Sequence, residues 1–265
     1  MIDFTEAELS DLIQLHKICN ELKTQLVIIG AMAYKFHFPE IERYTADIDL
    51  TVALDLDDFA ELEMRLSKLG WNRDAKREHR WKSPRAPLID LLPAGAKLRA
   101  AKKLIWPESQ FSMSLVGFDH VFSEAQTAKV NDLLTITVPP VPVLALLKIV
   151  AFLDRPYERE RDLQDLRGIL AHYEEGNDRL FSDQIQAANL ADFSLNSSFL
   201  LGVDLACLST AEEADVVETF LSRVSNETDA LWMLFVRAGA QAGDRVEDAA
   251  RLQLAAFVQG FRSRV

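Results

Sequence analysis

The chain has 265 residues, of which 49% are hydrophobic and 26% are charged, a composition typical of a folded globular protein and not of a disordered or fibrous one. Its formal net charge of −12 argues against non-specific binding of nucleic acid or anionic lipid over the whole surface. Its cysteines, Cys19 and Cys207, form no CxxC pair, so neither a disulfide framework nor a zinc ribbon is indicated.

Neither the amino terminus nor the most apolar segment has the features of a targeting or membrane segment. "MIDFTEAELSDLIQ" is acidic and amphipathic, unlike the basic-then-apolar layout of a signal peptide. The longest apolar run, residues 141–153, is too short to span a bilayer and is interrupted by Lys148. We therefore expect a cytoplasmic protein without a membrane partner.

The first part of the chain alternates helical and strand patterns. Apolar residues recur at helical spacing near the amino terminus, and short β-branched runs indicate buried strands. Pro39 stops one helix, and Gly70 ends another that opens on acidic capping residues. In chain order, we predict a helix over 6–24, a strand over 25–30, a short helix over 31–38, a strand over 47–54 and a helix over 55–70.

Residues 71–95 predict two strands joined by a basic loop, the second being "PLIDLLP". Within 111–138, the pieces "FSMSLVGF", "HVFSEA" and "LLTITV" are interpreted as further strands or a connection. Prolines at 139, 140 and 142 mark the start of a helical part of the chain, because the apolar residues of nearly every segment beyond them recur with a period of 3.6 residues. The sequence therefore predicts an α/β domain over 1–139 and a helical domain over 140–265, packed against it.

Two aspartates, Asp47 and Asp49, open an otherwise apolar strand. Side chains alternate along a strand, so both carboxylates share one face while Ile48 and Leu50 point into the core. Carboxylates about 6–7 Å apart on one face repel each other unless a cation lies between them. Mg²⁺ suits this role, since it binds one or two carboxylates together with substrate phosphates. Asp90, a lone charge in "PLIDLLP", would supply a third ligand from a neighbouring strand.

Each of these signals is weak by itself. A D-x-D pair is frequent by chance and often marks a strand end or a capped turn. Gly30, between a strand and a helix, permits close approach of the backbone to phosphate, but an ordinary turn is the alternative. A glycine turn, an acidic pair and a third acid in this order favour a metal-dependent phosphate site.

Gly30-Ala31, "RYTADIDLTV" (43–52), Asp90 in "IDLLP" and "LLKIVAFLDRPYERERDLQDL" (146–166) together resemble the nucleotidyltransferase superfamily with the DNA polymerase β-like fold. Within it they are most similar to the AbiEii/AbiGii-type group of bacterial abortive-infection and toxin–antitoxin proteins. The resemblance implies an α+β fold, with an N-terminal nucleotidyltransferase domain built on a mixed sheet and a C-terminal helical domain. It also implies an NTP substrate, Mg²⁺ as cofactor and an antitoxin partner.

The resemblance assigns roles to the matching positions. Asp47, Asp49 and Asp90 are implied as metal ligands and catalytic residues. The implied nucleotide-binding residues are Gly30, Ala31, Arg43, Thr45, Lys148, Asp162 and Asp165.

Several of these assignments have a simpler alternative. Ala31 departs from the Ser or Gly common in the superfamily, which removes a hydroxyl contact to phosphate but leaves the backbone amides. Lys148 also fits a lysine snorkelling from a half-buried helix. Asp162 and Asp165 also fit ion pairs with Arg159 and Arg161 on a solvated helix face.

Residues 71–103 carry ten basic and three acidic side chains, a net charge of +7 within this acidic chain. A polyanion such as tRNA could be guided to the metal site by this segment, and Trp71, Trp81 and Trp106 would offer stacking surfaces. A solvated loop that balances an acidic body, or an antitoxin interface, explains the same charge.

The leading hypothesis is an Mg²⁺-dependent nucleotidyltransferase that moves an NMP from an NTP to a hydroxyl group on tRNA or a protein. A small-molecule O-nucleotidyltransferase is the second hypothesis. The third is a catalytically inactive module that binds a nucleotide or a partner, for which Ala31 is the best indication.

Overall fold

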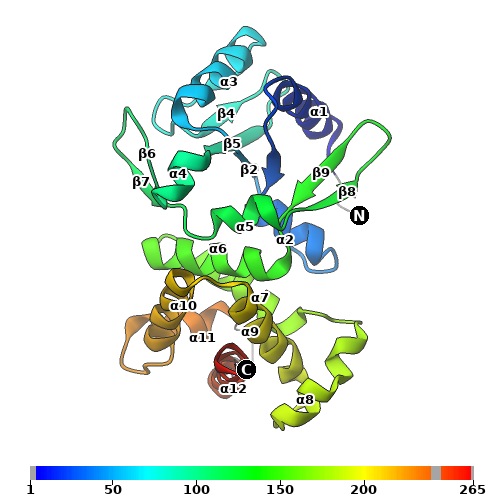
Figure 1. Cartoon of the computed structure of the whole chain (residues 1–265), viewed down its shortest axis with the longest axis vertical. Coiled ribbons are helices and arrows are strands. Elements are labelled where there is room, and N and C mark those ends of the chain that lie inside the picture. Colours follow the sequence, from blue (N-terminus) through cyan, green and yellow to red (C-terminus); the bar gives the residue numbers. More distant parts are fainter. Residues whose placement is uncertain (1–3, 240–245, 264–265) are drawn as a thin grey trace. The chain divides into compact units, whose positions relative to one another are not determined.

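The computed structural model describes residues 4–239 and 246–263. The chain separates into two compact units, Met1–Pro140 and Val141–Val265 (Figure 1). Among the described residues, no helix is both long enough and apolar enough to cross a membrane.

The described part of the first unit is organised by one five-stranded sheet with the strand order β1-β2-β5-β4-β3. Figure 1 labels its strands β2, β4 and β5. Its central strands β2 and β5 run parallel, and the other neighbouring pairs are antiparallel, so the sheet is mixed as expected. The strands are β1 (Leu26–Ile28), β2 (Asp47–Val52), β3 (Asn72–Arg73), β4 (Arg80–Lys82) and β5 (Leu88–Pro93).

Helices and two small hairpins complete the first unit. Helix α1 starts with a capping box, in which Thr5 and Glu8 exchange side-chain and backbone hydrogen bonds. The helices are α1 (Glu6–Glu21), α2 (Gly30–His37), α3 (Leu56–Lys68), α4 (Ala96–Ala100) and α5 (Phe118–Ser123). The hairpins are formed by β6 (Lys103–Ile105) with β7 (Ser112–Ser114) and β8 (Gln126–Lys129) with β9 (Thr135–Val138).

Three local predictions were wrong. Residues 71–95 form three strands instead of two, because the two-residue strand β3 pairs with β4 ahead of the predicted hairpin. "HVFSEA" belongs mainly to helix α5, in which Phe118, Val121 and Phe122 are buried at helical spacing. Asp55 is the N-cap residue of α3, but its carboxylate makes no cap hydrogen bond and instead accepts from the amides of Lys97 and Leu98 at the start of α4.

The second unit is helical in all its described elements, as the periodicity predicts. Helix α6 is buried along most of its length and packs against α7. The helices are α6 (Val141–Asp154), α7 (Glu160–His172), α8 (Asp183–Ala188), α9 (Asn196–Leu208), α10 (Ala211–Val224), α11 (Ala230–Ala238) and α12 (Val246–Arg262), with short 3-10 turns at Asp178–Phe181 and Phe193–Leu195.

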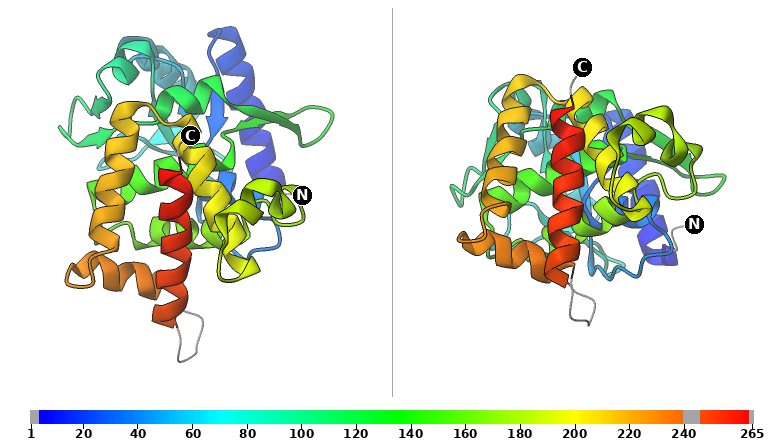
Figure 2. Two further views of the ribbon diagram at one scale, coloured as in Figure 1. Left: turned by 60° about the horizontal axis from the view of Figure 1, so that its bottom comes forward. Right: turned by 90° about the horizontal axis from the view of Figure 1, so that it is seen from below.

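Helices α9 and α12 are in backbone contact. Figure 2 shows α12, at the red end of the colour bar, beside α9 in both views. A Cβ at Gly260 would lie 2.0 Å from the carbonyl oxygen of Phe199, and one at Gly202 would lie 2.3 Å from that of Phe257. Glycine is therefore required on both helices at this crossing.

The crossing generates a stability prediction. In an exposed helix, Gly→Ala stabilises by up to about 1 kcal/mol. Gly260→Ala should instead lower the free energy of unfolding by about 1–3 kcal/mol, because the methyl group forces the helices apart. Urea denaturation measures the change in the free energy of unfolding. The control Ala255→Gly, at an exposed position of α12, measures how much an exchange of alanine and glycine changes that free energy through helix propensity alone. A stabilised Gly260→Ala variant would contradict the tight crossing.

Candidate active site

The pairing of β2 with β5 brings the three predicted metal ligands onto one face of the sheet. In this parallel register Asp49 is the partner of Asp90, and Asp47 lies two residues earlier on β2. Ile48 and Leu50 alternate with the aspartates and are buried, as predicted. Asp47, Asp49 and Asp90 are called the acidic cluster below.

Arg80 of β4 shares the face of the acidic cluster and contacts two of its members. Its Nε donates to Oδ1 of Asp90 at 2.8 Å, and its Nη2 donates to Oδ2 of Asp90 at 2.8 Å. The same Nη2 also donates to Oδ2 of Asp47. The hydrogen bonds with Asp90, together with the nearby carboxylate charges, raise the pKa of Arg80 above its ordinary value. Arg80 is therefore a permanent cation within the cluster.

Two further side chains surround the cluster. Nε2 of His79 lies 3.7 Å from Oδ2 of Asp90, and the His79 ring lies 5.9 Å from the ring of Trp106. Thr45 donates its hydroxyl to Oδ1 of Asp47 at 3.0 Å. Thr45, predicted as a nucleotide-binding residue, thus contacts a carboxylate of the cluster.

Sequence reasoning missed Arg80 and His79 as members of the site. A hairpin with its loop centred near Arg85 would have indicated this contact, because such a hairpin pairs Arg80 of β4 with Asp90 of β5. In the sequence, Arg80 is one of the ten basic residues of segment 71–103.

Gly30 lies against Asp49, where β1 leads into α2. Its φ is +63°, in the left-handed region, and a Cβ at this position would lie 2.1 Å from Oδ2 of Asp49. The amide of Ile29 donates to the backbone oxygen of Asp49 at 2.9 Å. Ala31 follows with its side chain buried. The turn therefore brings the start of α2, with its positive end of the helix dipole, to the acidic cluster.

The remaining predicted residue of the first unit, Arg43, is partly exposed, and its Nη1 donates to the backbone oxygen of Tyr44 at 2.6 Å. It precedes β2 on the segment that leads to Asp47.

The predicted residues of the second unit form a buried ionic cluster. Nζ of Lys148 on α6 donates to Asp162 at 2.7 Å and to Asp165 at 2.8 Å, both on α7. Burial lowers the pKa of Lys148, but the two carboxylates outweigh it and raise that pKa above its ordinary value. All three side chains are buried, so neither a snorkelling lysine nor a solvated face describes them. Arg159 adds a cation 3.6 Å from Asp162.

The structure thus groups the predicted residues in two sets. Gly30, Ala31, Thr45 and the acidic cluster meet in the first unit, with Arg43 nearby in sequence, and Lys148, Asp162 and Asp165 meet in the second. Among residues 4–239 and 246–263, no three His, Cys, Asp or Glu side chains lie close enough together, as they stand, to hold a metal ion. The donor chemistry of the acidic cluster nevertheless fits Mg²⁺, since its donors are carboxylate oxygens from neighbouring positions on one face of the sheet.

The tryptophans of the basic segment do not offer stacking surfaces. Trp71, Trp81 and Trp106 are each at most 2% exposed, because they belong to the core beneath the sheet and its hairpin. This part of the sequence prediction was wrong. Several basic side chains of the segment are also paired within the unit: Arg73 with Glu63 and Glu108, Arg85 with Asp11, and Arg99 and Lys102 with Asp119.

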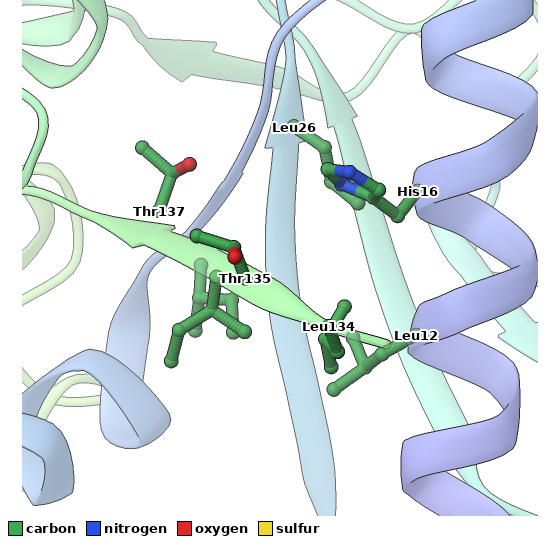
Figure 3. A pocket seen from close by; sticks show the side chains of 8 residues that line it. Leu12, His16, Leu26, Leu134, Thr135 and Thr137 are labelled. Atoms are coloured by element: carbon green, nitrogen blue, oxygen red, sulfur yellow. The ribbon is translucent and has the colours of Figure 1, made fainter. Parts of the chain in front are cut away.

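A small pocket lies between α1, β1 and β9, apart from the residues of the acidic cluster. Figure 3 shows Leu12 and His16 of α1 facing it from one side and Thr135 of β9 from the other. Its volume is about 10 Å³, the room of a single water molecule. It cannot admit a nucleotide.

Comparison with known proteins decides the family. The family model described as "Nucleotidyl transferase AbiEii toxin, Type IV TA system" matches residues 15–205, well over half of the chain. The chain belongs to the AbiEii family. It is therefore a nucleotidyltransferase of a toxin–antitoxin type, as the sequence motifs predicted. No curated protein sequence matches the chain.

Several solved structures are similar to this AbiEii-family chain. An antigenic nucleotidyltransferase-like protein from Paracoccidioides brasiliensis is 15% identical, with a TM-score of 0.42 over 67% of this chain and 83% of that chain. The crystal structure of ANT(2'')-Ia in complex with adenylyl-2''-tobramycin is also 15% identical, with a TM-score of 0.42 over 83% of this chain and 99% of that chain. The solution structure of the antibiotic-resistance factor ANT(2'')-Ia is 18% identical, with a TM-score of 0.35 over 56% of this chain and 75% of that chain.

The contact between Gly30 and Asp49 can be tested by a double-mutant cycle. Gly30→Ala should lower the free energy of unfolding by about 1–3 kcal/mol, because alanine at positive φ is strained and its methyl group meets the carboxylate. In an Asp49→Ala background the cost should be smaller, since the carboxylate is gone. Urea denaturation of the four proteins measures the coupling, and equal costs in both backgrounds would refute the close approach.

The ionic cluster of the second unit makes a separate prediction. Lys148→Met leaves two buried carboxylates without their shared cation, so it should lower the free energy of unfolding by roughly 3–5 kcal/mol. Arg161→Met, at an exposed position on α7, is the matched control and should change it by less than about 0.5 kcal/mol. Chemical denaturation at neutral pH measures the free energy of unfolding of both variants. Similar small effects would show that Lys148 does not neutralise the pair.

Proposed function

We propose that this AbiEii-family protein transfers an NMP from an NTP to a hydroxyl acceptor in an Mg²⁺-dependent reaction. The observation that carries the proposal is the register of β2 and β5, which aligns Asp49 with Asp90 on the face that also bears Asp47. The left-handed turn at Gly30 beside this face adds support, because its backbone can approach phosphate closely.

The acidic cluster would hold the metal, with Asp47, Asp49 and Asp90 as its ligands. When bound, Mg²⁺ supplies charge stabilisation for the attacking and leaving oxygens of an in-line displacement. Asp49 or Asp90 would accept the proton of the attacking hydroxyl group. The hydroxyl oxygen then forms a bond to the α-phosphorus, and the bond from that phosphorus to the pyrophosphate oxygen breaks, so pyrophosphate leaves.

The backbone at the start of α2 would bind the phosphates of the NTP. Ala31 offers no hydroxyl, so the amide groups and the helix dipole carry this contact. Arg43 and Thr45 remain proposed nucleotide-binding residues of the first unit, whereas Lys148, Asp162 and Asp165 of the second unit are buried and hydrogen-bonded to one another. In the structure Thr45 hydrogen-bonds Asp47, which suits a residue that orients a metal ligand.

For the acceptor we propose an RNA hydroxyl, such as that of tRNA. Five exposed basic side chains of segment 71–103 take part in none of the ion pairs given above, and together they would attract a polyanion toward the strand that carries Asp90. They are Lys76, Arg77, Lys82, Lys97 and Lys103. The family description as a toxin supports a cellular target and a cognate antitoxin as partner. A protein acceptor is the alternative, and the destination of a labelled nucleotide distinguishes it from RNA.

The experiment incubates the protein with each α-labelled NTP, Mg²⁺ and either total RNA or cell extract. Wild type should transfer label to RNA, and Asp47→Ala and Asp49→Ala should each lower the rate by at least about a hundredfold, because charge stabilisation is lost. Asp58→Ala, on the exposed side of α3, is the matched control and should retain activity.

The destination of the label discriminates among the functions. Label on protein identifies a protein acceptor, and label on a small molecule identifies an O-nucleotidyltransferase. If no acceptor is labelled, or if the aspartate variants label as well as wild type, the proposed catalytic function is wrong and a binding module remains.

A further inference from the structure

Arg80 is placed opposite Asp90 by the backbone, not by a chance side-chain conformation. The strands β4 and β5 pair antiparallel with Arg80 and Asp90 as partners. The amide of Arg80 donates to the backbone oxygen of Arg77 at 2.9 Å, and its carbonyl accepts from Asp74 at 2.8 Å, so its backbone groups point away from Asp90. In such a non-hydrogen-bonded pair the two side chains are at their closest.

The guanidinium of Arg80 engages every carboxylate oxygen of Asp90. The contact is bidentate: Nε donates to Oδ1 and Nη2 donates to Oδ2, each at 2.8 Å. A bidentate geometry is the strongest one for a guanidinium and a carboxylate. The side chains of Arg80 and Asp90 are only 16% and 11% exposed, so solvent screens the pair weakly. Nη2 additionally reaches Asp47, so one cation ties together the two strands β2 and β5 through their acids.

A metal ion and Arg80 compete for the same oxygen atoms. Each oxygen of Asp90 already accepts a hydrogen bond from Arg80, and a divalent ion bound to these oxygens would stand beside the guanidinium charge, which repels it. The guanidinium cannot be neutralised at any physiological pH, so it can free Asp90 only by moving its side chain. Without any cation, three neighbouring carboxylates would repel each other.

We propose that Arg80 is a built-in counterion of the acidic cluster, which holds Asp47 and Asp90 in position and which a divalent cation must displace from Asp90 in order to bind. This inference rests on the proposed metal-dependent function, because it assigns the metal to the same carboxylates. Arg80 is thereby a positioning residue that lowers the affinity of the cluster for the metal and stabilises the protein in the metal's absence.

The test measures the binding of Mn²⁺ to the full chain by the electron paramagnetic resonance signal of the free ion. Arg80→Gln removes the competing charge and should bind Mn²⁺ about tenfold more tightly than wild type, as expected for the loss of one nearby cation at a partly buried site. Its melting temperature without metal should fall, and Mn²⁺ should raise that temperature by more than it does in wild type.

Arg73→Gln is the matched control. Arg73 lies on β3 of the same sheet and also bridges two carboxylates, those of Glu63 and Glu108, but it contacts none of the acidic cluster in the described hydrogen bonds. Its replacement removes the same charge from the same sheet, so Mn²⁺ affinity should stay within about twofold of wild type. An equal gain in both variants would attribute the effect to net charge and overturn the proposal.

A measurement on wild type keeps the inference testable if Arg80→Gln does not fold. The Nε–H group of Arg80 donates to Asp90, so its ¹⁵N–¹H resonance should shift when Mg²⁺ is added. Arg80→Lys, which retains the positive charge, identifies the resonance by its absence. A resonance that is unchanged while Mg²⁺ saturates the protein would overturn the displacement.

The outcomes separate this inference from the proposed function. Equal or weaker Mn²⁺ binding by Arg80→Gln, with clear binding by wild type that Asp49→Asn abolishes, overturns the role of Arg80 and leaves the metal-dependent function standing. The absence of Mn²⁺ binding from wild type and Arg80→Gln alike overturns both. Binding by Arg80→Gln but not by wild type supports the proposal in its strongest form.

Discussion

The site depends on the parallel pairing of β2 with β5. That register makes Asp49 the neighbour of Asp90 and sets Asp47 beside them, so the sheet itself gathers like charges on one face. Like charges at such spacing are unfavourable unless a cation compensates them. In this structure Arg80 of β4 provides that cation. The chemistry proposed for the site follows from this single electrostatic demand, since a divalent ion would meet it more fully than one guanidinium.

The register cannot easily change, because the opposite face of the same strands forms the core. Ile48 and Leu50 of β2 pair with Ile89 and Leu91 of β5, and all four side chains are buried. A slip by one residue would exchange the two faces, exposing these apolar groups and burying the carboxylates. Hydrophobic burial on one side of the sheet therefore fixes the geometry of the acids on the other side.

Two charged clusters of the chain are compensated in different ways. In the second unit, Lys148 is buried and saturated by Asp162 and Asp165, a closed arrangement that joins α6 to α7. In the acidic cluster of the first unit, Arg80 contacts Asp47 and Asp90, and Asp47 keeps 27% of its side chain exposed. A partly open cluster suits the binding of a further cation, whereas a closed one stabilises the fold.

The sequence by itself determined the order of the elements, the family, the helical second half and the alternation that sets Asp47 and Asp49 on one face, because these depend on local periodicity and motif spacing. It could not determine which strands pair. The burial of the tryptophans, the helical state of "HVFSEA" and the contact of Arg80 with Asp90 were decided by tertiary structure. The physical reason is that local pattern constrains the direction of a side chain, whereas its partner is set by residues distant in the chain, whose approach depends on the burial of the whole core.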